Sequence, residues 1–145
     1  MTTFSHTVTI PGPPAEVFPW LLEDDLVPRW AGGVERYEVN GPLKAGARVR
    51  QRLHVSGQAI DVDMEIARYD PPREAETRFS TNGIDVVNVY SLAADGVAST
   101  RLTQSLDARA SGLTARLLLP AVQPRLERKL TEDLERLRAL LVERE

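Results

Sequence analysis

The sequence contains no cysteine and only two histidines. Without a thiol it can form no disulfide, iron-sulfur cluster, thiolate zinc site or cysteine nucleophile. The two histidines, His6 and His54, leave few candidates for metal binding or for a general base near neutral pH. The absence of cysteine therefore excludes a disulfide-stapled secreted domain, and we expect neither a bound metal nor a cofactor.

The chain also lacks an excess of positive charge, a long hydrophobic run and a leader-like segment. It has 18 Lys and Arg against 21 Asp and Glu, a net charge of -3, so it has no basic field to hold a nucleic-acid backbone. No stretch approaches the roughly 20 apolar residues of a membrane-spanning helix. The first residues do not have the pattern of a secretory signal. We expect a cytoplasmic protein that neither binds nucleic acid nor inserts into a membrane.

What the chain does have is enough apolar material for one core. It is 145 residues long, 42% hydrophobic and 27% charged, a composition typical of folded domains and not of disordered chains. This length allows one core and little room for a second. The sequence predicts a single globular domain over residues 1–145.

Most of the chain has the pattern of β-strands. Residues 4–10 alternate apolar and polar side chains, the period of a half-buried strand. After the proline-rich turn at 11–14 we expect two short helical segments, the first around 15–22 and the second around 24–30. Clusters of Gly, Pro, Asn and Asp then separate six further strands, predicted at 34–40, 47–55, 58–69, 74–81, 84–94 and 97–110.

One hairpin can be tested by its register, because pairing decides which side chains share a face. A two-residue loop at Ser56-Gly57 places arginines opposite carboxylates on one face, and apolar residues opposite one another on the other. The charged pairs are Arg48 with Glu65, Arg50 with Asp63 and Arg52 with Asp61; the other face pairs Val49 with Met64, Gln51 with Val62 and Leu53 with Ile60. We interpret the acidic row as half of a salt-bridge ladder rather than as a cation site.

Two further turns predict which residues face inward. Asn82-Gly83 has the signature of a type I′ turn and places Phe79 opposite Val86. At 94–96 an odd-length loop places Gln104 and Leu106 on the face of Tyr90, whereas a two-residue loop would place Arg101 there. We expect the odd loop, since it keeps that face largely apolar.

After Gly112 the apolar period becomes helical, with leucines recurring every three to five residues as far as Leu141. We expect Pro120 and Pro124 to interrupt the first part of this helix and to give a short N-terminal piece, a kink and a straight helix over about 122–143. The leucine stripe of that helix is expected to pack against the sheet rather than to contact a ligand; it comprises Leu126, Leu130, Leu134 and Leu137.

Six consecutive antiparallel strands need a cover, and this helix carries the only long apolar stripe. The sequence therefore predicts an α+β fold, a curved seven-stranded antiparallel sheet wrapped around a long C-terminal helix, with two short helices after the first strand. The element order and several local phrases resemble the START-like, helix-grip (SRPBCC) superfamily and, within it, the polyketide cyclase/dehydrase and lipid-transport family. The phrases are Pro14-Ala15-Glu16-Val17-Phe18, Trp30 before Gly33-Val34, Gly41-Pro42-Leu43-Lys44-Ala45-Gly46-Ala47 and Tyr69-Asp70-Pro71-Pro72-Arg73. The resemblance implies a cavity between sheet and helix, but it does not imply one particular reaction.

The inner face of the predicted sheet supplies the candidate ligand-binding residues. Gln51, Asn88, Tyr90 and Gln104 converge there, and such buried polar groups bond one another, hold water or orient a ligand. Met64, Phe79 and Leu106 would form apolar walls. Trp20 and Trp30, on the short helices, either close one end of the cavity or fill the core.

Candidates for acid-base catalysis are few. His6, on the apolar face of the first strand, and Tyr90 are the two, and His6 is equally well interpreted as a core histidine. His54 shares a face with Arg50 and is expected outside. By strand parity the acidic residues fall on outward or loop positions, so the interior is expected to hold no carboxylate. No phosphate-binding loop and no nucleophile elbow are present.

Three functions remain open. The first is binding of a small hydrophobic molecule, ring-containing, acyl or lipid-like, by a monomer or homodimer. The second is a cyclase or dehydratase reaction in the same cavity, which would act largely by proximity, with His6 or Tyr90 carrying the proton. The third is a protein-binding module, for which the charged outer strand faces offer no large apolar patch.

Overall fold

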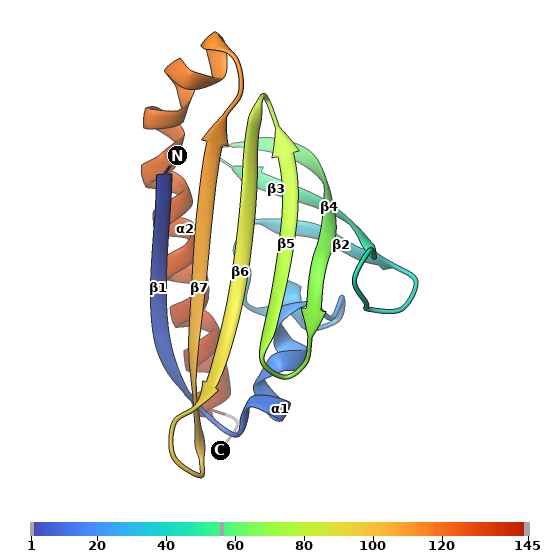
Figure 1. Ribbon diagram of the computed structural model, residues 1–145, viewed down its shortest axis with the longest axis vertical. Helices are drawn as coiled ribbons and strands as arrows, with labels where there is room; N and C mark the ends of the chain where they lie inside the picture. Colours follow the sequence, from blue (N-terminus) through green and yellow to red (C-terminus); the bar gives the residue numbers. More distant parts are fainter. Residues whose placement is uncertain (1, 56, 144–145) are drawn as a thin grey trace.

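The computed structural model describes residues 2–55 and 57–143, and its elements follow the predicted order (Figure 1). Seven strands, a long C-terminal helix and short helices after the first strand are all confirmed. Their bounds are β1 Thr2–Pro11, α1 Pro14–Val17, η1 Phe18–Leu21, η2 Val27–Arg29, β2 Val34–Asn40, β3 Arg48–Val55, β4 Gln58–Asp70, β5 Glu74–Thr81, β6 Ile84–Ala94, β7 Ser99–Ala110 and α2 Leu113–Glu143.

The strands form one antiparallel sheet in the order β1-β7-β6-β5-β4-β3-β2. It curves around α2, which lies along the inside of β1 and β7 (Figure 1). The short helices connect the two edge strands, β1 and β2, and close the end of the sheet opposite to the start of α2. This is the predicted helix-grip arrangement, and it leaves the inner faces of β3 to β6 turned toward the helix.

The predicted registers are confirmed. In the β3–β4 hairpin Arg48 is opposite Glu65 and Arg52 is opposite Asp61, with N···O distances of 3.4 and 3.2 Å. These pairs are exposed, so each contributes little to stability. Ser56, in the loop of this hairpin, lies outside the described residues.

The next two turns also have the expected geometry. Asn82 and Gly83 have φ of 51° and 77°, the positive values that a type I′ turn requires at both positions. Strands β6 and β7 pair Tyr90 with Gln104 and Ala94 with Thr100, so the loop between them has an odd length. Gln104 and Leu106 therefore lie on the inner face.

The predicted interruption of the C-terminal helix into two pieces is wrong. Helix α2 runs without interruption from Leu113 to Glu143 with Pro120 and Pro124 inside it. Each proline removes one intrahelical hydrogen bond, to the carbonyl four residues before it. Arg116 and Pro120 carry those carbonyls on the exposed side of the helix, where water can satisfy them, and the helix therefore continues.

The two halves of α2 are buried to different extents in the core. Leu130, Leu134, Leu137 and Leu141 are at most 4% exposed and belong to the main core, together with the sheet and the short helices. Only Ala115 of the first turns is fully buried, in a small separate cluster with Ile84, Val86 and Ala108. The second half of the helix is thus firmly packed and the first half lightly packed. No helix within the described residues is long and apolar enough to cross a membrane.

Candidate functional site

A cavity of about 380 Å³ lies between the concave face of the sheet and α2. Its walls are mainly aliphatic and aromatic and come from the short helices, from β2 to β7 and from α2. The apolar lining includes Leu22, Trp30, Tyr37, Leu53, Ile60, Val62, Met64, Phe79, Ile84, Leu106, Leu118, Leu126 and Leu130. The stripe residues Leu126 and Leu130 therefore do face the cavity, contrary to the expectation that they only pack against the sheet.

One wall of this cavity carries a polar ladder, Thr77, Asn88, Tyr90 and Gln104, on three neighbouring strands. The register places Thr77 opposite Asn88 and Tyr90 opposite Gln104. Gln104 Nε2 donates to Asn88 Oδ1 at 2.7 Å and to Tyr90 Oη at 3.5 Å, and Asn88 Nδ2 donates to Thr77 Oγ1 at 3.4 Å. All four side chains are at most 8% exposed. The polar side chains of the ladder therefore form most of their hydrogen bonds with one another.

The ladder is incomplete at Gln104. Its Oε1 atom is buried and has no hydrogen-bond partner. Leaving a buried acceptor unpaired costs about 1–3 kcal/mol. Gln104 is therefore the ladder residue that gains most from a change of side-chain position or from a new donor.

Tyr90 keeps its proton at neutral pH. Burial raises the pKa of its hydroxyl to about 12; the hydrogen bond with Asn88 opposes this rise, and the negative charge of Asp133 adds to it. A phenol with such a pKa can donate a hydrogen bond or a proton, but it does not serve as a base near pH 7. Burial also raises the pKa of Tyr37, whose hydroxyl donates to the Leu22 carbonyl at 2.9 Å.

A carboxylate, Asp133, lines the cavity, and the expectation that none does is wrong. Its side chain is 10% exposed. Asp133 follows Leu130 by three residues and so shares the inward face of α2. Strand parity says nothing about helical positions, whereas the leucine period of the helix would have identified this residue.

Three donors hold Asp133 in place. Its Oδ1 accepts from the Gly32 backbone N–H at 2.9 Å and from Arg136 Nη1 at 3.2 Å, and its Oδ2 accepts from Lys129 Nζ at 2.5 Å. Arg136 Nη1 also donates to the Trp30 carbonyl at 2.8 Å. This network fastens α2 to the loop before β2.

The two tryptophans have different positions. Trp30 lines the cavity, and its Nε1 donates to the Trp20 carbonyl at 2.7 Å. Trp20 is not part of the lining; the Arg29 guanidinium lies 4.8 Å from the centre of its ring. Trp20 is thus a core residue that positions Trp30, and its expected role in the cavity wall is wrong.

His6 is not in the cavity either. It lies on the inner side of β1, but β1 is an edge strand directly covered by α2. Its Nε2 is 2.9 Å from Glu135 Oε2, and its side chain is 27% exposed. His54 is outside, as expected, 2.5 Å from Glu35, where its hydrogen bond is the main cause of a lowered pKa of the Glu35 carboxyl.

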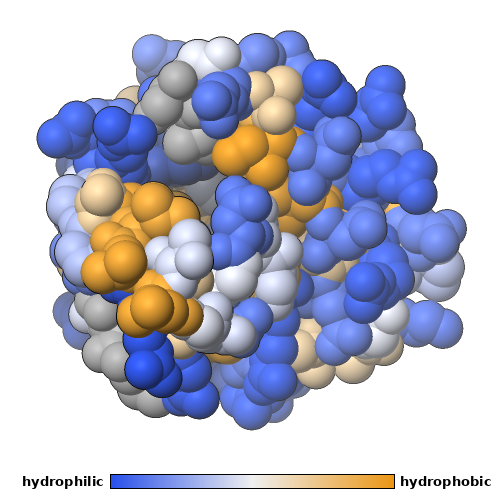
Figure 2. All heavy atoms as spheres, turned by 90° about the horizontal axis from the view of Figure 1, so that it is seen from above, coloured by the Kyte–Doolittle hydropathy of each residue, from blue (hydrophilic) through white to orange (hydrophobic). Residues whose placement is uncertain are grey.

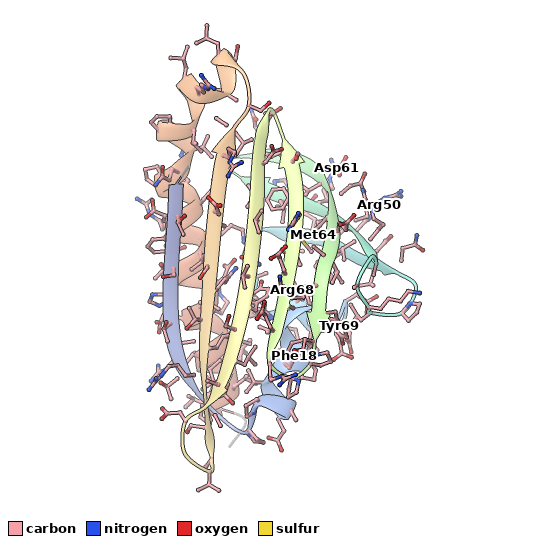
Figure 3. All side chains as sticks on the ribbon, in the orientation of Figure 1. Phe18, Arg50, Asp61, Met64, Arg68 and Tyr69 are labelled. Carbon is pink, nitrogen blue, oxygen red and sulfur yellow. The ribbon has the colours of Figure 1, made fainter. Side chains whose placement is uncertain are left out.

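The other predicted residues do line the cavity: Gln51, Met64, Phe79 and Leu106. Gln51 Nε2 contacts Met64 Sδ at 3.3 Å. Figure 3 places Met64 midway along β4, and Phe18 and Tyr69 at the end beside α1. These two rings meet edge to face at 5.5 Å. Within the described residues no three His, Asp or Glu gather as a metal site would require.

Comparison with known proteins agrees with this geometry. Residues 1–142 match the family model described as polyketide cyclase/dehydrase and lipid transport. The chain belongs to that family. No curated protein matches the sequence.

Solved structures at low identity have the same fold as this member of the family. The protein TTHA0849 from Thermus thermophilus is 17% identical, with a TM-score of 0.80 over 97% of each chain. A START superfamily protein from Mycobacterium smegmatis is 15% identical, with a TM-score of 0.75 over 96% of this chain and 98% of the other. The di-domain ARO/CYC StfQ from the steffimycin biosynthetic pathway is 13% identical, with a TM-score of 0.80, and the match covers 98% of this chain and 51% of StfQ.

Proposed function

We propose that this protein binds a small hydrophobic molecule, ring-containing or acyl, between the sheet and α2. The observation that carries the proposal is the cavity of about 380 Å³, whose walls are largely apolar and carry one polar ladder. Small-molecule sites in proteins typically have this volume and a mainly apolar lining with a few polar groups. The family description, which includes lipid transport, agrees with an apolar ligand.

The apolar lining and the polar ladder would contribute differently to binding. Each 100 Å² of apolar ligand surface removed from water contributes about 2.5 kcal/mol, so affinity would come from the leucines and aromatic rings. Asn88, Tyr90 and Gln104 would orient a polar group of the ligand. The hydroxyl of Tyr90 keeps its proton and is available as a donor.

A cyclase or dehydratase reaction is the alternative that the similarity to the ARO/CYC protein suggests. Tyr90 could supply a proton in such a reaction. A base is harder to find, because Asp133 is paired with three donors and His6 lies outside the cavity. We therefore favour binding over catalysis. A purely protein-binding role is less favoured too, since side chains do not fill the cavity.

Filling the cavity tests the proposal. Leu106→Trp adds a ring inside it, and Val97→Trp adds the same ring on the β6–β7 loop, where Val97 is fully exposed. The probe is the fluorescent naphthalene 1-anilinonaphthalene-8-sulfonate, and native mass spectrometry of freshly purified protein checks for a copurifying molecule. We expect wild type and Val97→Trp to bind the probe alike and folded Leu106→Trp to bind it at least about tenfold more weakly. Equal binding by all three would refute the cavity as the site.

A further inference from the structure

The first half of α2 is apolar on the face turned away from the protein. Ala115 points into the small core cluster, whereas Leu113 and Leu117 are 75% and 73% exposed. Helical periodicity of about 3.6 residues per turn places Pro120, Ala121 and Pro124 on the same outward face, and all three are exposed. We call these five residues the apolar ridge. It reverses the usual pattern of a surface helix, whose outer face is polar.

The apolar ridge lies beside the mouth of the cavity. Leu118, next to it on the helix, is 45% exposed and also lines the cavity. The turn between β5 and β6 contributes Asn82 to the same mouth. Figure 2 views the molecule from this end and shows hydrophobic side chains gathered among a mostly hydrophilic surface. The apolar surface outside is therefore continuous with the apolar cavity inside.

The surroundings of the ridge are basic, although the protein is acidic. Residues 108–131 contain five Lys and Arg and a single acidic residue, Glu127, in a chain whose net charge is -3. Arg116 and Arg128 are both exposed. By helical position Arg116 lies along one side of the ridge, whereas Arg128 follows Pro124 by four residues and continues the row at its far end. Lys129 is paired with Asp133, so the charge available to a partner at the ridge is that of the exposed Arg116 and Arg128.

We propose that this end of the molecule docks on the surface of an anionic lipid bilayer, with the apolar ridge among the headgroups and the cavity mouth facing the membrane. An apolar helix face bordered by arginines is the pattern of an interfacial helix that lies in the membrane surface without crossing it. Anionic lipids supply negative charge to Arg116 and Arg128. A bilayer also dissolves the kind of molecule that the cavity fits.

A second copy of this chain fits the ridge less well. Symmetric pairing of two ridges would bring the arginines of both copies together, with only Glu127 to offset them, and like charges in such an interface are unfavourable. The ridge is also a narrow row along one helix, far from the extent of a stable dimer interface.

Vesicle flotation with the full chain tests this. Wild type is mixed with phosphatidylcholine vesicles or with vesicles containing about 30% phosphatidylglycerol, at low salt and at about 0.5 M NaCl. The first variant is Leu113→Ser/Leu117→Ser, and its matched control is Val97→Ser, which removes an exposed valine at the opposite end of the molecule. The second is Arg116→Gln/Arg128→Gln, with Arg73→Gln as control. None of these residues lines the main cavity, so probe binding to the cavity reports separately on the proposed function.

Wild type and both controls should float with the anionic vesicles at low salt and much less at high salt or with neutral vesicles. Each double variant should lower the partition coefficient at least about tenfold while probe binding is unchanged. The proposal is overturned if wild type does not float with anionic vesicles, or if Val97→Ser and Arg73→Gln lose as much as the ridge and arginine variants. It is also overturned if sedimentation shows a wild-type dimer that the leucine variant dissolves and neither floats, since the ridge would then be a protein interface.

Discussion

Replacing Asp133 with alanine should lower the free energy of unfolding by about 3 kcal/mol. The loss of a charge-assisted bond to the Gly32 N–H contributes about 1.5–3 kcal/mol. The side chains of Lys129 and Arg136 are 32% and 47% exposed, so water can solvate them when Asp133 is removed. The loss of each ion pair therefore lowers the free energy of unfolding by only about 0.5 kcal/mol. Asp133→Asn keeps an acceptor for Gly32 and should cost about 1 kcal/mol.

Urea unfolding followed by circular dichroism measures these differences, and Glu135→Gln, on the same helix, is the control. In a domain of this size about 3 kcal/mol corresponds to a fall of the melting temperature of roughly 9 °C. The alanine variant should also change the fluorescence of Trp30, whose carbonyl is held by Arg136. If Asp133→Asn destabilises as much as Asp133→Ala, or if neither exceeds Glu135→Gln, the network does not fasten the helix to the loop as we describe.

Three further outcomes follow from the geometry. Asn88→Leu removes the middle of the polar ladder and should weaken binding of the naphthalene probe several-fold while the protein stays folded; unchanged affinity would mean that Asn88 orients no ligand. The Tyr90 pKa of about 12, above the ordinary value of about 10, means that the stability linked to its buried neutral hydroxyl is present below pH 10 and is lost as pH rises toward 12; ultraviolet titration against Tyr90→Phe should show no tyrosinate from this residue at pH 10. Gly33 has φ of +74° and a Cβ there would lie 2.7 Å from the His54 carbonyl, whereas Gly41 has φ of +83° and open space around it, so Gly33→Ala should cost at least about 2 kcal/mol more than Gly41→Ala in the same unfolding assay.

The sheet is predictable because its signals are local. The two-residue loop between β3 and β4 gives a register in which their charges complement one another, and the type I′ turn at Asn82-Gly83 fixes another hairpin. Each register then determines which side chains face inward. That is why the sequence alone assigns Gln51, Asn88, Tyr90 and Gln104 to the inner face.

Two of the errors, at His6 and Trp20, concern contacts between different elements. His6 has the correct face, but only the packing of α2 on β1 decides that it meets Glu135 instead of the cavity. The position of Trp20 outside the cavity likewise depends on its contacts with Arg29 and Trp30 of the next helical segment. Proline propensity predicts a break in α2 that the exposed position of the freed carbonyls makes unnecessary. These outcomes depend on tertiary context, which local propensity does not contain.

The unequal packing of α2 has a kinetic consequence. Amide hydrogens near Leu134 and Leu137 can exchange with solvent only when the main core opens, whereas those near Leu117 need only release Ala115 and its few neighbours. Local opening of the first turns then has a much smaller free energy than global unfolding. Since Leu118 of this segment lines the cavity, we expect a molecule bound as proposed to enter and leave by this local fraying while the rest of the protein stays folded.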